Sequence, residues 1–127
     1  MSDNNNVKTL LVVDDSRVSR MMIRAFVLAK QPHWAIIEAA SGNEAVELVA
    51  HNPPDFCTMD INMPGLNGID AAALILEKQP KVRVVILTAN IQGVNQNRAT
   101  ELGARFVSKP VTEKAIAQAL EFFESVA

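Results

Sequence analysis

Short apolar runs alternate along the chain with stretches of helical periodicity, beginning with Leu10, Leu11, Val12 and Val13. A continuous apolar run of this length is typical of a parallel strand that is covered on both faces. Further strands are predicted at residues 34–39, 56–59, 82–87 and 106–107, and the strand at 56–59 ends at Asp60. The pattern therefore predicts strands separated by helices, and no pair of adjacent strands joined by a tight turn.

A helical pattern follows each predicted strand. The first helix starts at Ser16 and is bounded by Pro32, and a second starts at the capping box of Ser41 and Glu44 and runs to about residue 51. A third follows the turn-rich loop 62–68, a looser fourth spans about 90–102, and a fifth follows Thr112. On the first helix we expect the following side chains in or near the core: Val18, Met21, Met22, Ala25 or Phe26, and Ala29.

Five strand-then-helix units in sequence predict an α/β fold, with a doubly wound, mainly parallel sheet and helices on both faces. We expect one domain over residues 7–127, preceded by a disordered polar lead at 1–6. In such sheets, ligand chemistry gathers beyond the carboxyl ends of the strands. The residues that end each strand are therefore the candidates for a functional site.

Composition narrows the class of protein. Of 127 residues, 49% are apolar and 20% charged, which is ordinary for a globular domain, and the net charge of −2 with no dense basic run argues against nucleic-acid binding. No apolar stretch approaches the roughly 20 residues of a membrane span, and the polar start does not resemble a signal peptide. Cys57 is the only cysteine, so no internal disulfide forms; we expect it to be buried and inert in a cytoplasmic protein.

Polar residues with complementary chemistry end the predicted strands: Asp14 and Asp15 after the first, Asp60 after the third, Thr88 after the fourth and Lys109 after the fifth. Two carboxylates about 4 Å apart repel by about 4 kcal/mol at an effective dielectric near 20, so such a cluster requires cations. Lys109 supplies one charge, and Mg2+ is the ion that best suits carboxylate ligands beside a phosphate group. A carboxylate in this setting is able to attack a phosphoryl group and form an aspartyl phosphate.

Four motifs carry a resemblance to bacterial two-component receiver domains: VVDDS at 12–16, MDINMPGLNG at 59–68, TA at 88–89 and FVSKP at 106–110. The likeness covers about residues 8–125, with the motifs in the family's order, and is closest to the chemotaxis-type single-domain response regulators. It implies a flavodoxin-like fold with the five strands in the order 2-1-3-4-5, an order known for that family.

The resemblance also implies roles for the strand-end residues. Asp60 corresponds to the phosphoacceptor. Asp15 corresponds to a direct Mg2+ ligand, Asp14 to a ligand acting mainly through water, and Asn62 to a ligand through its backbone carbonyl.

Four further positions match the family's phosphoryl-binding and switch residues. Thr88 and Lys109 are expected to contact the phosphoryl group, and Ala89 is the small residue that leaves access to it. Phe106 takes the aromatic switch position, where many members have Tyr, so any role of a phenolic hydroxyl is missing here. The peptide bond between Lys109 and Pro110 is expected to be cis.

The implied function is a phosphorylation-activated signalling switch, rather than an enzyme acting on a separate substrate. The phosphoryl donor would be the phosphohistidine of a sensor kinase or a phosphotransfer protein, and slow autodephosphorylation would reset the switch. The output would be contact with a target protein on the face built from the 90–102 helix, the fifth strand and the last helix. Neither nucleic acid nor membrane is an expected direct partner, and we expect a monomer or a phosphorylation-dependent dimer.

Three alternative functions compete with this interpretation. A flavin-binding electron carrier needs a hydroxyl- and glycine-rich phosphate loop where this chain has Asp14 and Asp15, which would repel an anionic cofactor. A phosphohydrolase with an aspartyl nucleophile needs a second carboxylate at the position of Asn62 and a cap domain. A receiver belonging to a longer regulator with a separate output domain is the remaining alternative, although a start at Met1 and an end just after the last helix favour a stand-alone protein.

Overall fold

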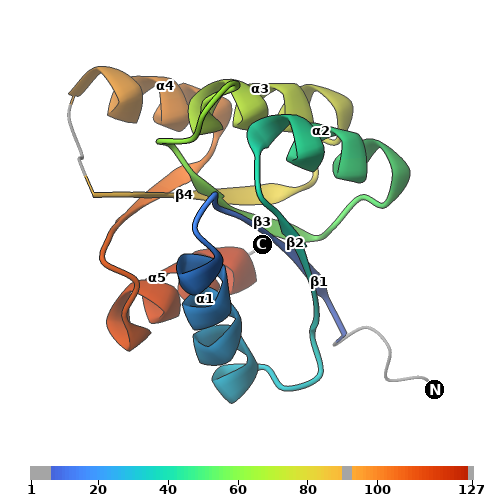
Figure 1. The fold of residues 1–127 in the computed structure, drawn as a ribbon, viewed down its shortest axis with the longest axis vertical. Helices are drawn as coiled ribbons and strands as arrows, with labels where there is room; N and C mark the ends of the chain where they lie inside the picture. The colour runs from blue at the N-terminus through green and yellow to red at the C-terminus, as the bar shows by residue number, and fades with distance from the viewer. Residues whose placement is uncertain (1–6, 90–92, 126–127) are drawn as a thin grey trace.

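Strands and helices alternate along the whole described chain of the computed structural model (Figure 1), which covers residues 7–89 and 93–125, with the side chains of residues 93–96 and 99 left out. The elements are β1 (Thr9–Val13), α1 (Arg17–Lys30), β2 (Ala35–Ala39), α2 (Gly42–His51), β3 (Phe56–Asp60), α3 (Gly68–Lys78), β4 (Arg83–Thr88), α4 (Gly93–Leu102), β5 (Arg105–Ser108) and α5 (Glu113–Glu124).

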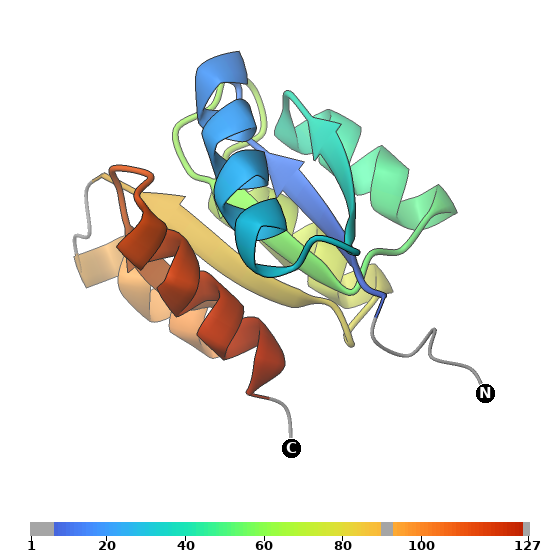
Figure 2. The same cartoon turned by 90° about the horizontal axis from the view of Figure 1, so that it is seen from below.

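The five strands form one parallel sheet in the order β2-β1-β3-β4-β5, which confirms the predicted fold and strand order. Helices α1 and α5 cover one face of the sheet, while α2, α3 and α4 cover the other (Figures 1 and 2). Because all strands run the same way, their carboxyl ends meet at one edge.

Alternate residues of the strands feed two separate apolar cores. Leu11 and Val13 of β1 face the core under α2, α3 and α4, whereas Leu10 and Val12 face the core under α1 and α5. Every residue of β3 is buried, as expected for the central strand of a sheet covered on both faces. At the amino edge of the sheet, Phe56 lies between the rings of Trp34 and Phe123, with centroids 5.1 and 4.7 Å away.

Four helices begin at capping residues that the sequence motifs place at or next to a helix start. The side-chain oxygens of Ser16, Ser41, Asn67 and Thr112 each accept a hydrogen bond from the backbone N–H three residues later. The Glu44 carboxylate reaches back to the N–H of Ala40, 2.8 Å away, which closes the predicted capping box one residue before the cap. These caps fix where each helix leaves the carboxyl edge of the sheet.

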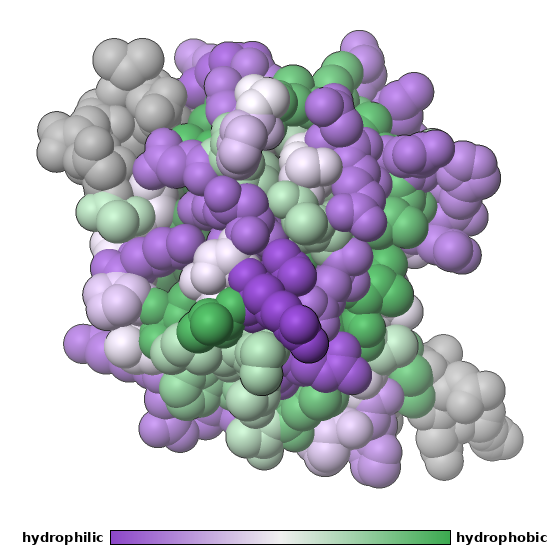
Figure 3. Space-filling view, in the orientation of Figure 1, coloured by the Kyte–Doolittle hydropathy of each residue, from purple (hydrophilic) through white to green (hydrophobic). Residues whose placement is uncertain are grey.

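Most of the buried face predicted for α1 is wrong. Of the predicted side chains only Phe26, which is partly buried, packs against the core, and both Ala25 and Ala29 are exposed. The side chains that enter the core are Ile23 and Val27, whereas Val18, Met21 and Met22 are 65%, 56% and 39% exposed. The space-filling view shows apolar surface over α1 beside a strongly hydrophilic band (Figure 3). Because α1 carries apolar residues on more than one face, helical periodicity alone selects the wrong face.

The other differences concern element ends. The strands begin or end within one residue of their predicted limits, and Trp34 and Val82 lie just outside β2 and β4. Helix α4 is described from Gly93, so the predicted start at 90–92 lies outside the described residues. The helix ends just before Gly103, whose φ of 84° is typical of the glycine that terminates a helix.

Candidate functional site

The carboxyl edge of the sheet brings three carboxylates together. Oxygen atoms of Asp14, Asp15 and Asp60 all lie within 4.8 Å of one another. Asp14 and Asp60 are 1% and 6% exposed, whereas Asp15 is exposed to solvent. Asp14 and Asp15 directly follow β1 and Asp60 ends β3, so the predicted clustering at this edge is present in the structure.

Lys109 compensates part of this negative charge. Its Nζ lies 3.1 Å from Asp14 Oδ2 and 3.3 Å from Asp60 Oδ1, so one ammonium contacts the ends of two strands. The backbone N–H of Lys109 donates to the carbonyl of Thr88 at 2.8 Å, which fixes its approach from β5. The Lys109–Pro110 peptide is cis, as expected.

Burial and the neighbouring charges shift the pKa values of Asp60 and Lys109. Burial, followed by the neighbouring charge of Asp14, raises the pKa of Asp60, and Lys109 partly opposes this. Burial of the Lys109 ammonium works against its charge, but the charges of Asp14 and Asp60 outweigh burial and raise the pKa of Lys109. The Lys109 amine is therefore protonated at neutral pH and lies beside the buried carboxylate of Asp60.

The loop after Asp60 wraps tightly around its backbone. The N–H groups of Met63 and Gly68 both donate to the carbonyl of Ile61, at 3.0 and 3.1 Å. A Cβ at Gly68 would overlap the carbonyl oxygen of Asp60, so only glycine allows α3 to begin this close to the strand. Gly65 has a φ of 77°, which also favours glycine. Asn62 lies in this loop with its side chain exposed.

The predicted switch residues lie on the neighbouring strands. Thr88 ends β4 and is buried, Ala89 follows it at an exposed position, and Thr88 is in register with Ser108 of β5. Phe106 is partly buried against the core under α2, α3 and α4. Phe106 and Ser108 are two positions apart on β5, and Ser108 is in register with Thr88, so Phe106 and Thr88 belong to the same face of the sheet.

The cluster has the chemistry of a magnesium site. Its donors are carboxylate oxygens, which are hard ligands, and no histidine or cysteine joins the group among the described residues. Exposure of Asp15 leaves one side of the cluster open, as an ion that keeps waters and contacts a phosphate requires. Asp14, Asp15 and Asp60 therefore fit Mg2+, and they are the side chains that would hold it.

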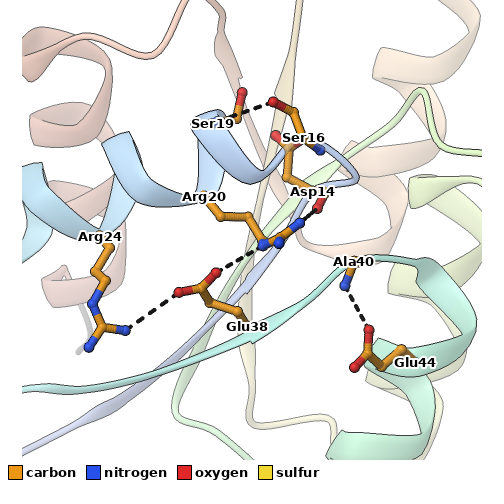
Figure 4. A network of polar contacts seen from close by, with 8 residues as sticks. All are labelled: Asp14, Ser16, Ser19, Arg20, Arg24, Glu38, Ala40 and Glu44. Carbon is orange, nitrogen blue, oxygen red and sulfur yellow. Dashed lines mark hydrogen bonds and ion pairs between the residues drawn. The ribbon is translucent and has the colours of Figure 1, made fainter.

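One residue that the motifs do not single out contacts the site, and a second residue holds the first in place. Arg20 of α1 donates through Nη1 to the backbone carbonyl of Asp14 and through Nε to Glu38 of β2, both at 2.8 Å (Figure 4). The signal available in the sequence is Glu38, a charged residue inside the otherwise apolar run 34–39.

Other reactive groups lie apart from the acidic cluster. Cys57 is fully buried, as expected, and burial raises the pKa of its thiol to about 12. His33 and His51 are exposed. A groove of about 1110 Å3 at the amino edge of the sheet is lined by Trp34 and Phe56 among others, and holds none of the strand-end residues. None of the described helices has the length and apolar character of a membrane span.

Comparison with known proteins agrees with the motifs. A family model described as response regulator receiver domain matches residues 10–121. The chemotaxis protein CheY of Thermotoga maritima is 36% identical over 114 residues, covering 89% of this chain and 94% of that protein. The protein-glutamate methylesterase/protein-glutamine glutaminase of Archaeoglobus fulgidus is 40% identical over 80% of this chain, but only 29% of that protein is covered. The crystal structure of the response regulator domain of Thermotoga maritima CheB superposes with a TM-score of 0.81 at 34% identity, covering 94% of this chain and 95% of that one.

Proposed function

The chain belongs to the response regulator receiver domain family of two-component signalling, and on that premise we propose that it is a switch phosphorylated on Asp60. The donor is the phosphohistidine of a sensor histidine kinase or a phosphotransfer protein. The observation that carries the proposal is the position of Lys109 Nζ, within 3.3 Å of Asp60 Oδ1 and 3.1 Å of Asp14 Oδ2. A cation there screens the repulsion that an incoming phosphoryl group meets from the carboxylates.

The proposed transfer is a substitution at phosphorus. A carboxylate oxygen of Asp60 forms the new P–O bond while the P–N bond to the donor imidazole breaks. The electron pair of the broken bond stays on the imidazole nitrogen, which takes up a proton. Burial and the charge of Asp14 raise the pKa of Asp60, while Lys109 opposes the rise and favours the carboxylate form, which is the nucleophile.

Lys109 and Thr88 hold the transferred group. The Lys109 ammonium contacts a phosphoryl oxygen without losing its neighbour Asp14, and the Thr88 hydroxyl donates to another oxygen. The small side chain of Ala89 leaves the approach open. Each of these residues ends or directly follows a strand, so the rigid sheet sets their spacing.

Mg2+ is the proposed cofactor. Asp14, Asp15 and Asp60, with the backbone carbonyl of Asn62, would hold it. When bound, it would neutralise the charge that the cluster and the phosphoryl oxygens share.

The proposed output is a change in the face formed by α4, β5 and α5, read by a target protein. Phosphorylation shifts a conformational equilibrium only if one conformation contacts the phosphoryl group better than the other. Movement of Thr88 toward the phosphoryl oxygens would leave room for Phe106 to turn inward.

We propose that the protein is cytoplasmic and is either a monomer or a dimer that forms on phosphorylation. Residues 7–127 are the proposed receiver unit, and its proposed output is protein contact alone. The same unit would serve equally within a longer regulator.

Incubation with a small acyl phosphate and Mg2+ tests the central step. Intact mass is expected to rise by one phosphoryl group in the parent and in the control variant Asp55→Asn. Asp55 precedes β3 at the end opposite Asp60 and accepts a hydrogen bond from the Thr9 N–H. Asp60→Asn is expected to show no gain. Equal labelling of Asp60→Asn and the parent would assign the phosphoryl group to another residue.

A further inference from the structure

Arg20 connects the residue that follows β1, Asp14, to Glu38 of β2. It lies in the first turns of α1, and its side chain is only 15% exposed. Nη1 donates to the main-chain carbonyl of Asp14 and Nε donates to Glu38 Oε1, each at 2.8 Å. Glu38 lies on β2, in register with Val12 of β1. The guanidinium therefore bridges the end of β1 to the adjacent strand, as its planar set of donors allows.

The carbonyl that Arg20 contacts belongs to the peptide that joins the two acidic residues. Every other polar group of Asp14 is also held. Its N–H donates to Ala39 at 3.1 Å, Oδ1 accepts from the Ser16 N–H at 2.9 Å, and Oδ2 accepts from Lys109. Asp15 has an exposed side chain, so its position depends on the peptide before it. The contact from Arg20 sets the plane of that peptide.

Glu38 keeps the guanidinium in place. It contacts Arg20 Nε at 2.8 Å and Arg24 Nη1 at 3.5 Å, as Figure 4 shows, so the carboxylate lies between two arginines of α1. Arg24 is 46% exposed, and the structure gives it no contact with Asp14. Only one of the two arginines thus reaches the acidic cluster, although both share the same helix and the same partner.

We propose that Arg20, oriented by Glu38, is a positioning residue for the acidic cluster: it fixes the Asp14–Asp15 peptide so that the carboxylates are preset for a divalent cation. The proposal rests on the phosphorylation function proposed above and adds a specific residue to it. Mg2+ demands near-ideal geometry of its ligands, so a preset pair of carboxylates binds it better than a loose pair. Arg20 contacts neither the ion nor the phosphoryl group in this scheme.

Arg20→Lys is the variant that tests positioning. Lysine keeps the positive charge but cannot donate along two fixed directions to Asp14 and Glu38. Mg2+ affinity is measured from the rise in melting temperature with Mg2+ alone, without any phosphoryl donor. The Mg2+ concentration giving half of the maximal rise is expected to increase about 10-fold, at the lower end of what loss of an outer-shell partner causes.

Phosphorylation kinetics supply a second readout. If Arg20 positions the cluster, saturating Mg2+ restores most of the phosphorylation rate of Arg20→Lys, while the Mg2+ concentration for half-maximal rate stays raised. Arg24→Gln is the matched control and is expected to match the parent in both measurements. Glu38→Gln leaves an oxygen for Arg20 Nε and is expected to fall between the parent and Arg20→Lys, and it replaces Arg20→Lys in the test if that variant does not fold.

The outcomes separate this proposal from the one on which it rests. A parent that neither gains stability from Mg2+ nor takes up a phosphoryl group would overturn the proposed function itself. A parent that does both, with Arg20→Lys indistinguishable from Arg24→Gln in the Mg2+ titration, would overturn the role of Arg20 alone. Lower stability of Arg20→Lys in EDTA with an unchanged Mg2+ midpoint would reduce Arg20 to a purely structural residue and equally overturn the proposal.

Discussion

Gly68 lies against the main-chain carbonyl of Asp60 so closely that a Cβ at position 68 would overlap the carbonyl oxygen. In an ordinary helix, alanine is favoured over glycine by about 1 kcal/mol. At position 68 we expect alanine to be the less stable residue. Gly68→Ala should lower the free energy of unfolding by about 3 kcal/mol, at the upper end of the cost of overpacking. It should also slow the proposed phosphorylation of Asp60, because it displaces the strand end that carries the proposed nucleophile. Urea denaturation and phosphoryl uptake measure the two effects.

Gly103→Ala is the matched control. Nothing lies within 4 Å of a Cβ there, but the φ of 84° strains any residue other than glycine. The expected loss of stability is about 1–2 kcal/mol, with phosphoryl uptake close to that of the parent. If Gly68→Ala behaved like Gly103→Ala in both measurements, close contact with Asp60 would not be what selects glycine.

Asp60→Asn should stabilise the protein at neutral pH when no divalent ion is present. Burial and the charge of Asp14 raise the pKa of Asp60, so the folded state holds this proton more tightly than the unfolded state does. Stability therefore falls as pH rises from the unfolded pKa of about 3.9 through the raised folded pKa, and the cost remains above it. Asn removes that cost, so the variant's advantage should grow as pH rises through the raised pKa of Asp60 and disappear below the unfolded pKa of about 3.9. Melting curves in EDTA across this pH range measure it, and a variant less stable than the parent at neutral pH would contradict it.

The same substitution, threonine to valine, should change stability in opposite directions at Thr58 and at Thr112. Thr58 Oγ1 is fully buried between β1 and β4 and finds no hydrogen-bond partner among the described residues. An unsatisfied buried hydroxyl costs about 1–3 kcal/mol, so Thr58→Val, which keeps the shape, should raise the free energy of unfolding by about 1 kcal/mol. Thr112→Val removes the cap that accepts the Ala115 N–H and should lower it by about 1 kcal/mol. Chemical denaturation of both variants measures the two free energies of unfolding. A loss of stability in Thr58→Val would indicate that the Thr58 hydroxyl has a hydrogen-bond partner.

Thr88→Ala should separate phosphorylation from its output. Asp60 and Lys109 remain, so phosphoryl uptake should stay measurable. The hydroxyl that would move toward the phosphoryl oxygens is gone, so the backbone amide signal of Phe106 should shift much less than in the phosphorylated parent. Signals from the outer face of α2 should stay nearly still in both proteins. An undiminished shift at Phe106 would mean that the signal takes another route.

Much of this architecture could be predicted from the sequence because its signals are local. Ser41 and Glu44 mark a helix start by hydrogen bonds within one turn, and the apolar run at 10–13 marks a covered strand. The strand-end residues Asp14, Asp60 and Lys109 follow from the geometry of a parallel sheet, which collects its carboxyl ends at one edge.

What could not be predicted depends on contacts between distant segments. Helix α1 carries Val18, Met21 and Met22 on one side and Ile23 and Val27 on another, and only packing against the sheet decides which side is buried. In the same way, nothing local relates Arg20 to Glu38, because the contact exists only once β2 lies beside β1.

The aromatic stack of Trp34, Phe56 and Phe123 at the amino edge of the sheet determines what the tryptophan fluorescence of this protein reports. Trp34 is the only tryptophan, and it lies against Phe56 at the start of β3, whereas Asp60 ends that strand. Its emission therefore reports loss of the folded core and is a poor sensor of ions or phosphoryl groups at the opposite edge. This separation is useful for engineering. Phe106→Trp in a Trp34→Phe background would put the only indole on β5, where its emission should follow the proposed switch, whereas the emission of the natural protein should follow unfolding.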